Sequence, residues 1–448
     1  MAPRQKLVCK NSAPFINLDT SGIDIGATEL YVAVPPDRSN TPIRCFGTFT
    51  DDLLSLAQWL KTCGVRSVAM ESTGVYWIPV FQILEAQGFE VCLVNARHVK
   101  NVPGRKTDVS DCQWLQYLHS VGLLRGSFRP PQQVCAVRSL GRHRDSLTQM
   151  ASVHVQHMQK ALTQMNLQLH HVVSDITGVT GLNILDAILA GERNPQTLAK
   201  LRNPRIRASK ETVAKSLVGD FRPEHLFTLD QSLQAFRHYQ GLIAACDQKM
   251  KTLLQDFDSQ VNPIDNPLPP STKGRLKTKE APSATLRTEL YRITGVDLTE
   301  IPGIQATTAH TLIAEIGTDM SKFPSAKHFA SWLGLCPDNR VSGGKILSVK
   351  TRAVSNRAAG ALRIAAQGLY RNESALGGFF RRMRAKQGAP KAITSTAHKL
   401  ALVIYHMLKD KTSYDHTRFA HHEQQHKRRM EVRLKHQAKA MGFALVPA

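Results

Sequence analysis

The sequence predicts an α/β layer fold for its first ~125 residues, followed by a mostly helical remainder. Three observations support this. Short apolar runs of strand length alternate with turn residues and single helices near the N-terminus. Beyond Pro130 the apolar residues recur every three or four positions, which is the period of a helix. Residues 259–285 are rich in Pro, Ser and Lys with few apolar residues, as is typical of a flexible linker.

The N-terminal region is expected to begin with an antiparallel hairpin or meander, since its first three apolar runs are separated by polar turns. A strand, a helix and another strand are expected to follow the meander. Pro103 and Gly104 mark a further turn, and Thr107 is placed to cap a helix. The predicted strands are 22–26, 30–34, 45–49, 65–71 and 91–95, and the predicted helices are 78–86 and 107–118.

A long apolar seam characterises the helical region 130–258. It recurs at alternating spacings of three and four, the a/d pattern of a coiled coil, and a second candidate helix runs from about 229 to 257. The seam needs a partner helix, in the same chain or in a second protomer. We favour a second protomer, because a seam of this length left alone is an exposed patch. Its members are Val155, Met158, Leu162, Met165, Leu169 and Val172.

The chain of 448 residues has a formal net charge of +23. Such a surface attracts polyanions, so nucleic acid is the favoured partner and acidic proteins are disfavoured. The apolar fraction of 42% is ordinary for a folded protein and argues against global disorder. No apolar run approaches the ~18 residues of a membrane span, and Met1–Lys10 lacks a signal-peptide core, which indicates a cytoplasmic, nucleoid-associated protein without membrane contact.

The eight cysteines are scattered and form no C-x-x-C pair, so reduced, buried thiols are expected rather than a zinc site. The tail, residues 411–448, is rich in His, Lys and Arg. Its apolar residues show no periodicity before the last few positions, which predicts a solvated basic arm that binds phosphates. The spacings of its histidines do not match those of a tetrahedral metal site.

Four carboxylates stand at the ends of elements in the first domain. Asp24 lies in the first strand between glycines, and Glu71 ends a later strand. Asp108 and Asp111 are three residues apart on a predicted helix and project from one face. Carboxylates that converge from two strands and a helix suit Mg²⁺, which prefers oxygen ligands. From spacing alone, we favour the alternative in which each of these carboxylates is a surface charge or a helix-capping charge.

A second candidate lies at Ser342, between Pro337 and the Gly343-Gly344 pair, where an exposed loop is expected. The surrounding cations would hold a phosphate backbone. No His or Asp lies in the sequence context of a hydrolase triad, so another group has to activate the serine. On composition alone a simple turn serine is favoured. The cations expected to contact nucleic acid are Arg340, Lys345, Lys350, Arg352 and Arg357.

The segment Leu298–Gly303 ends in a Pro-Gly turn between predicted helices. Backbone N–H groups at such a turn can face a phosphate, as in helix-hairpin-helix DNA binders. A purely structural αα-turn is an equal alternative.

In this order, the motifs resemble the DEDD-type insertion-sequence transposases of the IS110 family, which are bridge-RNA-guided serine recombinases. The matching stretches are GIDIG, VAMESTG and VPGRKTDVSDCQWLQYL, followed far downstream by IPGIQATTAHTLIAEIG and WLGLCPDNRVSGGK. The order and spacing of these stretches cover about 300 residues. Region 130–258 matches only loosely, and the linker and tail have no obvious counterpart in shorter members.

The resemblance implies a RuvC-like, ribonuclease-H-type first domain in which Asp24, Glu71, Asp108 and Asp111 bind Mg²⁺. It also implies that Ser342 attacks DNA and forms a transient phosphoserine link. The implied partners are donor and target DNA, a noncoding bridge RNA and further copies of the chain, as a dimer or tetramer. Arg105 and Lys106, within the third motif, are expected to bind nucleic acid.

The resulting domain plan has a metal-binding domain, a helical or coiled-coil region, a linker, a C-terminal transposase domain with the serine, and a basic tail. One alternative function is a metal-dependent RuvC-like nuclease or Holliday-junction resolvase, in which Ser342 only shapes a loop. Another is a nucleic-acid-packaging protein whose charge alone matters. The domain ranges are 18–128, 130–258, 259–285, 286–410 and 411–448.

Overall fold

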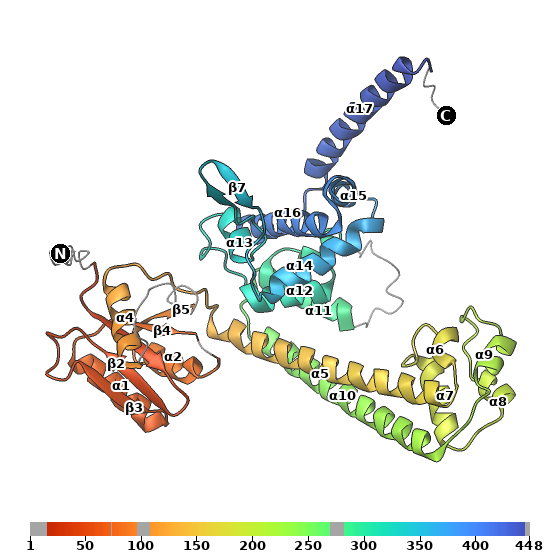
Figure 1. The fold of residues 1–448 in the computed structure, drawn as a ribbon, viewed down its shortest axis with the longest axis horizontal. Coiled ribbons are helices and arrows are strands. Elements are labelled where there is room, and N and C mark those ends of the chain that lie inside the picture. The colour runs from red at the N-terminus through yellow and green to blue at the C-terminus, as the bar shows by residue number, and fades with distance from the viewer. Residues whose placement is uncertain (1–15, 73, 96–107, 269–281, 444–448) are drawn as a thin grey trace, which may run out of the picture. The chain divides into compact units, whose positions relative to one another are not determined.

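The computed structural model describes residues 16–72, 74–95, 108–268 and 282–443 (Figure 1). The chain divides into two compact units, residues 1–129 and residues 130–448. Each unit has a hydrophobic core of its own. Arg105 and Lys106, and the predicted cap Thr107, lie outside the described residues.

The N-terminal unit is built on a mixed sheet of five strands in the order β3-β2-β1-β4-β5 (Figure 1). Strands β1, β2 and β3 form the predicted antiparallel meander, whereas β4 and β5 run parallel to β1. The α/β layer predicted for this region is confirmed. The strands are β1 (Thr20–Ile25), β2 (Glu29–Ala33), β3 (Ile43–Gly47), β4 (Ser67–Glu71) and β5 (Glu90–Val94).

Helices cover both faces of this sheet. On one face, α1 (Thr50–Thr62) and α2 (Trp77–Ala86) pack against apolar side chains of β1 and β4, including Ile23 and Met70. On the other face lies α4 (Asp108–Ser120), whose start agrees with the predicted cap region. Helix α1 was not among the predicted elements, although its buried residues Leu53, Leu56, Ala57 and Leu60 have helical spacing.

Helix α4 rests directly on β1 because position 22 is a glycine. A Cβ atom at Gly22 would overlap the carbonyl oxygen of Cys112 and the backbone nitrogen of Gln116. The Gln116 side chain donates a hydrogen bond of 3.2 Å to Thr20 Oγ1. In the last turn of the helix, His119 Nε2 lies 2.7 Å from Ser67 Oγ on β4. The helix therefore spans β1 and β4 at close range.

The C-terminal unit begins with a long antiparallel pair of helices, α5 (Gln132–Gln164) and α10 (Pro223–Gln255), which lie side by side (Figure 1). Within the seam, Met158, Leu162 and Met165 are fully buried in one core with Leu229 and Leu233 of α10. The expectation that the seam pairs with a second protomer is therefore wrong for these residues. The chain supplies its own partner helix, and that removes the exposed patch on which the expectation rested.

The seam also ends earlier than its pattern suggests. Helix α5 stops at Gln164, and Asn166 adopts a left-handed backbone with φ of 55°. Leu169 and Val172 then belong to a separate short helix within a small helical cluster at the end of the pair. Gly178 and Asn194 stand at helix N-caps. The cluster comprises α6 (Leu169–Val172), α7 (Val179–Leu189), α8 (Pro195–Lys200) and α9 (Lys210–Ser216).

The remaining part of the unit is mostly helical, as predicted, and packs around α16, whose Tyr405 is 1% exposed. Its first described helix, from Pro282, begins within the predicted linker 259–285. Most of the basic tail forms an exposed helix. The elements are α11 (Pro282–Thr294), η1 (Leu298–Glu300), α12 (Ala306–Ile316), α13 (Ala326–Trp332), β6 (Arg340–Ser342), β7 (Lys345–Ser348), α14 (Arg357–Gly368), η2 (Leu369–Arg371), α15 (Ala375–Gln387), α16 (Ala389–Asp410) and α17 (His416–Ala440).

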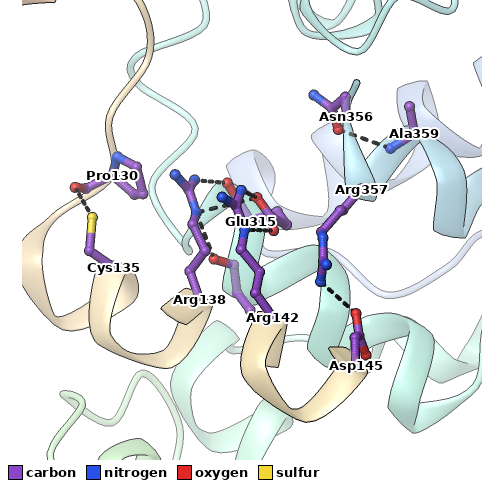
Figure 2. A network of polar contacts seen from close by, with 10 residues as sticks. Pro130, Cys135, Arg138, Arg142, Asp145, Glu315, Asn356, Arg357 and Ala359 are labelled. Atoms are coloured by element: carbon purple, nitrogen blue, oxygen red, sulfur yellow. Dashed lines mark hydrogen bonds and ion pairs between the residues drawn. The ribbon is translucent and has the colours of Figure 1, made fainter. Parts of the chain in front are cut away.

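A buried carboxylate joins α5 to α12 (Figure 2). Arg142 donates two hydrogen bonds to the Glu315 carboxylate, at 3.0 and 2.9 Å, and Arg138 Nε lies 3.3 Å from the same group. Arg138 also donates to the backbone carbonyl of Glu315. The Glu315 side chain is only 9% exposed, so this pair of arginines compensates a charge removed from water.

We expect Glu315→Gln to destabilise the C-terminal unit by about 3 kcal/mol, because it leaves the half-buried Arg138 without its carboxylate. Chemical denaturation of the full-length protein, followed by circular dichroism, measures the change. The matched control is Asp186→Asn, which removes the partner of Arg237 from an ion pair that is about half exposed. That substitution is expected to cost at most about 1 kcal/mol. Equal losses of stability in the two variants would contradict the assignment of Glu315 as a buried carboxylate whose charge the arginines compensate.

Within the described residues, no helix is long and apolar enough to cross a membrane. The seven cysteines that the structure describes are all free thiols. Cys63, Cys112 and Cys246 are buried, but Cys45 is exposed, so the expectation of buried thiols holds only in part.

Candidate active site

The sheet register brings Asp24 and Glu71 to neighbouring strand positions. In the parallel pair β1 and β4, Ile23 lies opposite Met70. Asp24 and Glu71 are the next residues on their strands, at the carboxyl ends of both. Adjacent strands are about 4.8 Å apart, so the two carboxylates leave the sheet within reach of one another.

Both carboxylates are on the face of the sheet that α4 covers. Gly22 faces α4, and side chains alternate along a strand, so Asp24 shares that face with Gly22. Ile23 and Met70 point the opposite way, into the core formed with α1 and α2. Because Glu71 follows Met70 as Asp24 follows Ile23, it too is on the α4 face.

Asp111 approaches the same place from α4. The buried Cys112 beside it reports the local electrostatics: burial raises the pKa of this thiol to about 12, and the carboxylates of Asp24 and Asp111 both add to the increase. Negative charge from β1 and from α4 thus converges on one helical turn. The backbone of Asp108 begins α4, one turn earlier, and its side chain lies outside the described atoms.

The donor chemistry of this set fits a divalent cation. Its members supply only carboxylate oxygens, the ligand type that Mg²⁺ and similar ions prefer. Among the side chains that the structure describes, no three His, Cys, Asp or Glu form a closed metal-binding group. The fit therefore rests on the register of Asp24 with Glu71 and on the position of Asp111 over the same sheet face.

Ser342 stands at the tip of a two-stranded hairpin in the C-terminal unit. Strand β6 pairs with β7 so that Ser342 faces Lys345 across the Gly343-Gly344 turn. Both glycines have positive φ, 53° and 75°, which a tight two-residue turn of this kind requires. The expected loop is therefore an ordered hairpin, and Ser342 is exposed on it as predicted.

The hairpin also displays apolar side chains to solvent, a feature that the sequence-based prediction missed. Val341, Ile346 and Leu347 are 58%, 67% and 68% exposed. An isolated two-stranded hairpin is only marginally stable in water. Exposed apolar surface of this kind is typical of contact sites.

The predicted cations divide into two groups. Lys345 and Lys350 are both exposed; Lys345 lies opposite Ser342 beside the hairpin tip, whereas Lys350 lies at the base of the hairpin, where its carbonyl accepts a hydrogen bond from the backbone N–H of Asp338. Arg352 instead donates a hydrogen bond of 2.6 Å to the Ser331 carbonyl. Arg357 forms a 2.6 Å ion pair with Asp145 of α5, visible in Figure 2. For Arg340 only the backbone is described.

The Pro-Gly turn packs inside the C-terminal unit. Ile301 and Ile304 are fully buried, and Gly303 has a φ of 89°. A Cβ atom at Gly303 would lie 2.9 Å from the Ala365 carbonyl oxygen on α14. Close helix packing explains this glycine, so the structural αα-turn is favoured over a phosphate-binding turn.

A cavity of about 860 Å³ lies between α5, α10 and α12. Its arginines already have carboxylate partners: Arg142 binds Glu315, Arg144 binds Asp247, and Arg357 binds Asp145. Burial, with a smaller effect of Arg144, lowers the pKa of His310 in its wall. Internal charge compensation of this kind indicates a structural junction rather than an anion site.

Comparison with known proteins adds three similarities. Residues 21–167 match a family model for the DEDD domain of IS110-type transposases, and residues 297–381 match a model described as the transposase IS116/IS110/IS902 family. Together they span more than half of the chain. All four predicted carboxylates lie in the first match and Ser342 lies in the second.

A curated relative is the insertion element IS110 uncharacterized 43.6 kDa protein of Streptomyces coelicolor, which is 31% identical over 120 residues. The aligned part is 26% of this chain and 29% of the relative's length. The mixed five-stranded sheet with helices on both faces is the ribonuclease-H-like fold expected of a DEDD domain, and such a domain implies a divalent metal.

Proposed function

Because the chain belongs to the IS110 family of transposases, with a DEDD domain followed by the family's second domain, we propose that it is a DNA strand-transfer enzyme of an insertion sequence. We further propose that Ser342 becomes covalently joined to DNA and that a noncoding RNA selects the DNA sites. The observation that most strongly supports a metal-dependent strand-transfer enzyme is the register that sets Asp24 beside Glu71 on the face covered by α4.

In the proposed reaction, Asp24, Glu71, Asp108 and Asp111 hold Mg²⁺ on the sheet. The bound cation supplies positive charge that stabilises the charge developing on a scissile phosphate. The pairing of Asp24 with Glu71 keeps two of these oxygen donors on rigid strands, so little reorganisation accompanies binding.

Ser342 is the proposed nucleophile. Its Oγ attacks the phosphorus, an Oγ–P bond forms, and one P–O bond to deoxyribose breaks; the Oγ proton is lost and the leaving oxygen departs as a hydroxyl. Attack by a hydroxyl of the second DNA then breaks the Oγ–P bond and restores a phosphodiester. The number of phosphodiester bonds is conserved, so no external energy source is required. Lys345 holds the backbone near the hairpin tip, and Lys350 holds it near the base of the hairpin.

The proposal requires the carboxylates and Ser342 to meet at one phosphate, within one protomer or between two. The exposed apolar side chains of the hairpin support this requirement, because they provide a surface for such contact. The net charge of +23 suits an assembly that holds RNA and two DNA segments at once.

The test combines the protein, Mg²⁺, donor and target DNA, and RNA transcribed from the DNA flanking its reading frame. After denaturation, we expect a DNA-linked protein band and recombinant DNA, both dependent on Mg²⁺ and on that RNA. A scrambled RNA of equal length is the control. Full recombination with the scrambled RNA would refute RNA guidance, and recombinant DNA formed without any linked band at any time point would refute the serine intermediate.

A further inference from the structure

The C-terminal helix α17 is strongly basic and almost fully exposed. Residues 416–440 contain seven Lys or Arg against two Glu, with five His besides. Of its side chains that the structure describes, all are exposed except that of Ala438. At 1.5 Å per residue a helix of this size is about 37 Å long, close to one ~34 Å turn of duplex DNA.

One face of α17 gathers cations for which the described side chains supply no carboxylate partner. Arg429, Arg433 and Lys439, with His436 between them, fall within about 120° of arc at 100° per residue. We call these four residues the α17 basic face. In the described part of the chain, none of its Lys and Arg side chains takes part in an ion pair, whereas Lys435 on a neighbouring position pairs with Glu431 at 2.7 Å.

This arrangement is unfavourable for the isolated helix. Arg429 and Arg433 are four residues apart, a spacing at which like charges repel and destabilise a helix. Few tertiary contacts offset the repulsion, because nearly the whole described helix is in solvent. A polyanion laid along the basic face relieves the repulsion and releases its own counterions, so charge complementarity selects a nucleic-acid backbone as the occupant.

We propose that the α17 basic face binds the phosphate backbone of a nucleic acid, as a surface separate from the strand-transfer residues. The proposal goes beyond the reaction at Ser342 and requires no chemistry there. Binding at the α17 basic face depends on charge and not on base sequence, because the face offers long flexible cations and no set of groups matched to base edges. Its ligand is either duplex DNA or structured RNA, which share this backbone chemistry.

The test measures binding by fluorescence anisotropy at several salt concentrations, with a labelled DNA duplex and a labelled RNA hairpin of about 30 base pairs each. Full-length Ser342→Ala protein is the background, so binding is read without strand transfer. We expect the triple change Arg429→Gln, Arg433→Gln and Lys439→Gln to weaken binding about tenfold or more, and to make the slope of log K against log salt shallower by about 2 to 3, for at least one probe. The probe affected identifies the ligand.

Two further variants and two further readouts decide the outcome. Lys200→Gln, Arg205→Gln and Arg207→Gln remove the same charge from exposed positions around α8, and should leave the slope nearly unchanged. Arg429→Lys with Arg433→Lys should retain wild-type affinity. An unchanged slope in the triple variant, or an equal loss in the α8 control, would overturn the proposal. So would loss of self-association, or of binding to phosphatidylserine vesicles, with nucleic-acid binding intact.

Discussion

Replacing Ser342 by alanine is expected to abolish both the protein–DNA link and the recombinant product, a loss of at least about a thousandfold. The substitution removes the only protein atom proposed to bond to phosphorus. It should leave the hairpin intact, because the turn depends on Gly343 and Gly344 and on pairing with Lys345, which the change does not touch. Denaturing electrophoresis of labelled DNA measures the link, and sequencing across the junction measures the product.

The matched control is Ser355→Ala, another exposed serine in the same unit, 13 residues further along the chain. Its activity should equal that of the wild type. Recombination by the Ser342→Ala protein at more than a few per cent of the wild-type rate would exclude Ser342 as the nucleophile.

Asp24→Asn is expected to stop DNA cleavage, again by at least about a thousandfold, while the protein stays folded. The amide has the size of the carboxylate but lacks its charge, so the α4 face of the sheet loses one anionic ligand beside Glu71. Single-turnover cleavage with Mg²⁺ measures the effect. Thermal unfolding provides a second readout: Mg²⁺ should raise the melting temperature of the wild type more than that of the variant.

Asp51→Asn is the control for this change, because Asp51 is an exposed carboxylate in the first turn of α1 in the same unit. It should cleave DNA normally and respond to Mg²⁺ as the wild type does. Normal cleavage by the Asp24→Asn protein would exclude a role for the carboxylates in the reaction.

Taken together, the two variants separate the proposed recombinase from a nuclease or junction resolvase. A resolvase that uses activated water needs Asp24 but not Ser342, so Ser342→Ala would still cut DNA without forming a link. A recombinase with a serine nucleophile needs both. Loss of cutting in both variants, with a link only in the wild type, is the pattern that we expect.

The sequence by itself determined the elements of the N-terminal sheet and the family. Strand-length apolar runs with turn residues between them are local features, and β1, β2, β4 and β5 fall where these features predict them. The motifs around Asp24, Glu71, Asp108 and Asp111 are also local, so their order along the chain was enough to indicate a DEDD domain.

Only the tertiary structure decided which surfaces meet. The seam of α5 reads the same whether its partner is α10 or a second protomer, because periodicity records that a face is apolar and not what covers it. Likewise, Arg352 and Arg357 look like DNA contacts in sequence, but Ser331 and Asp145, distant along the chain, bind them. Gly22 has no visible role until α4 lies on β1. Contacts between residues far apart in sequence depend on packing of the whole unit, which no local pattern encodes.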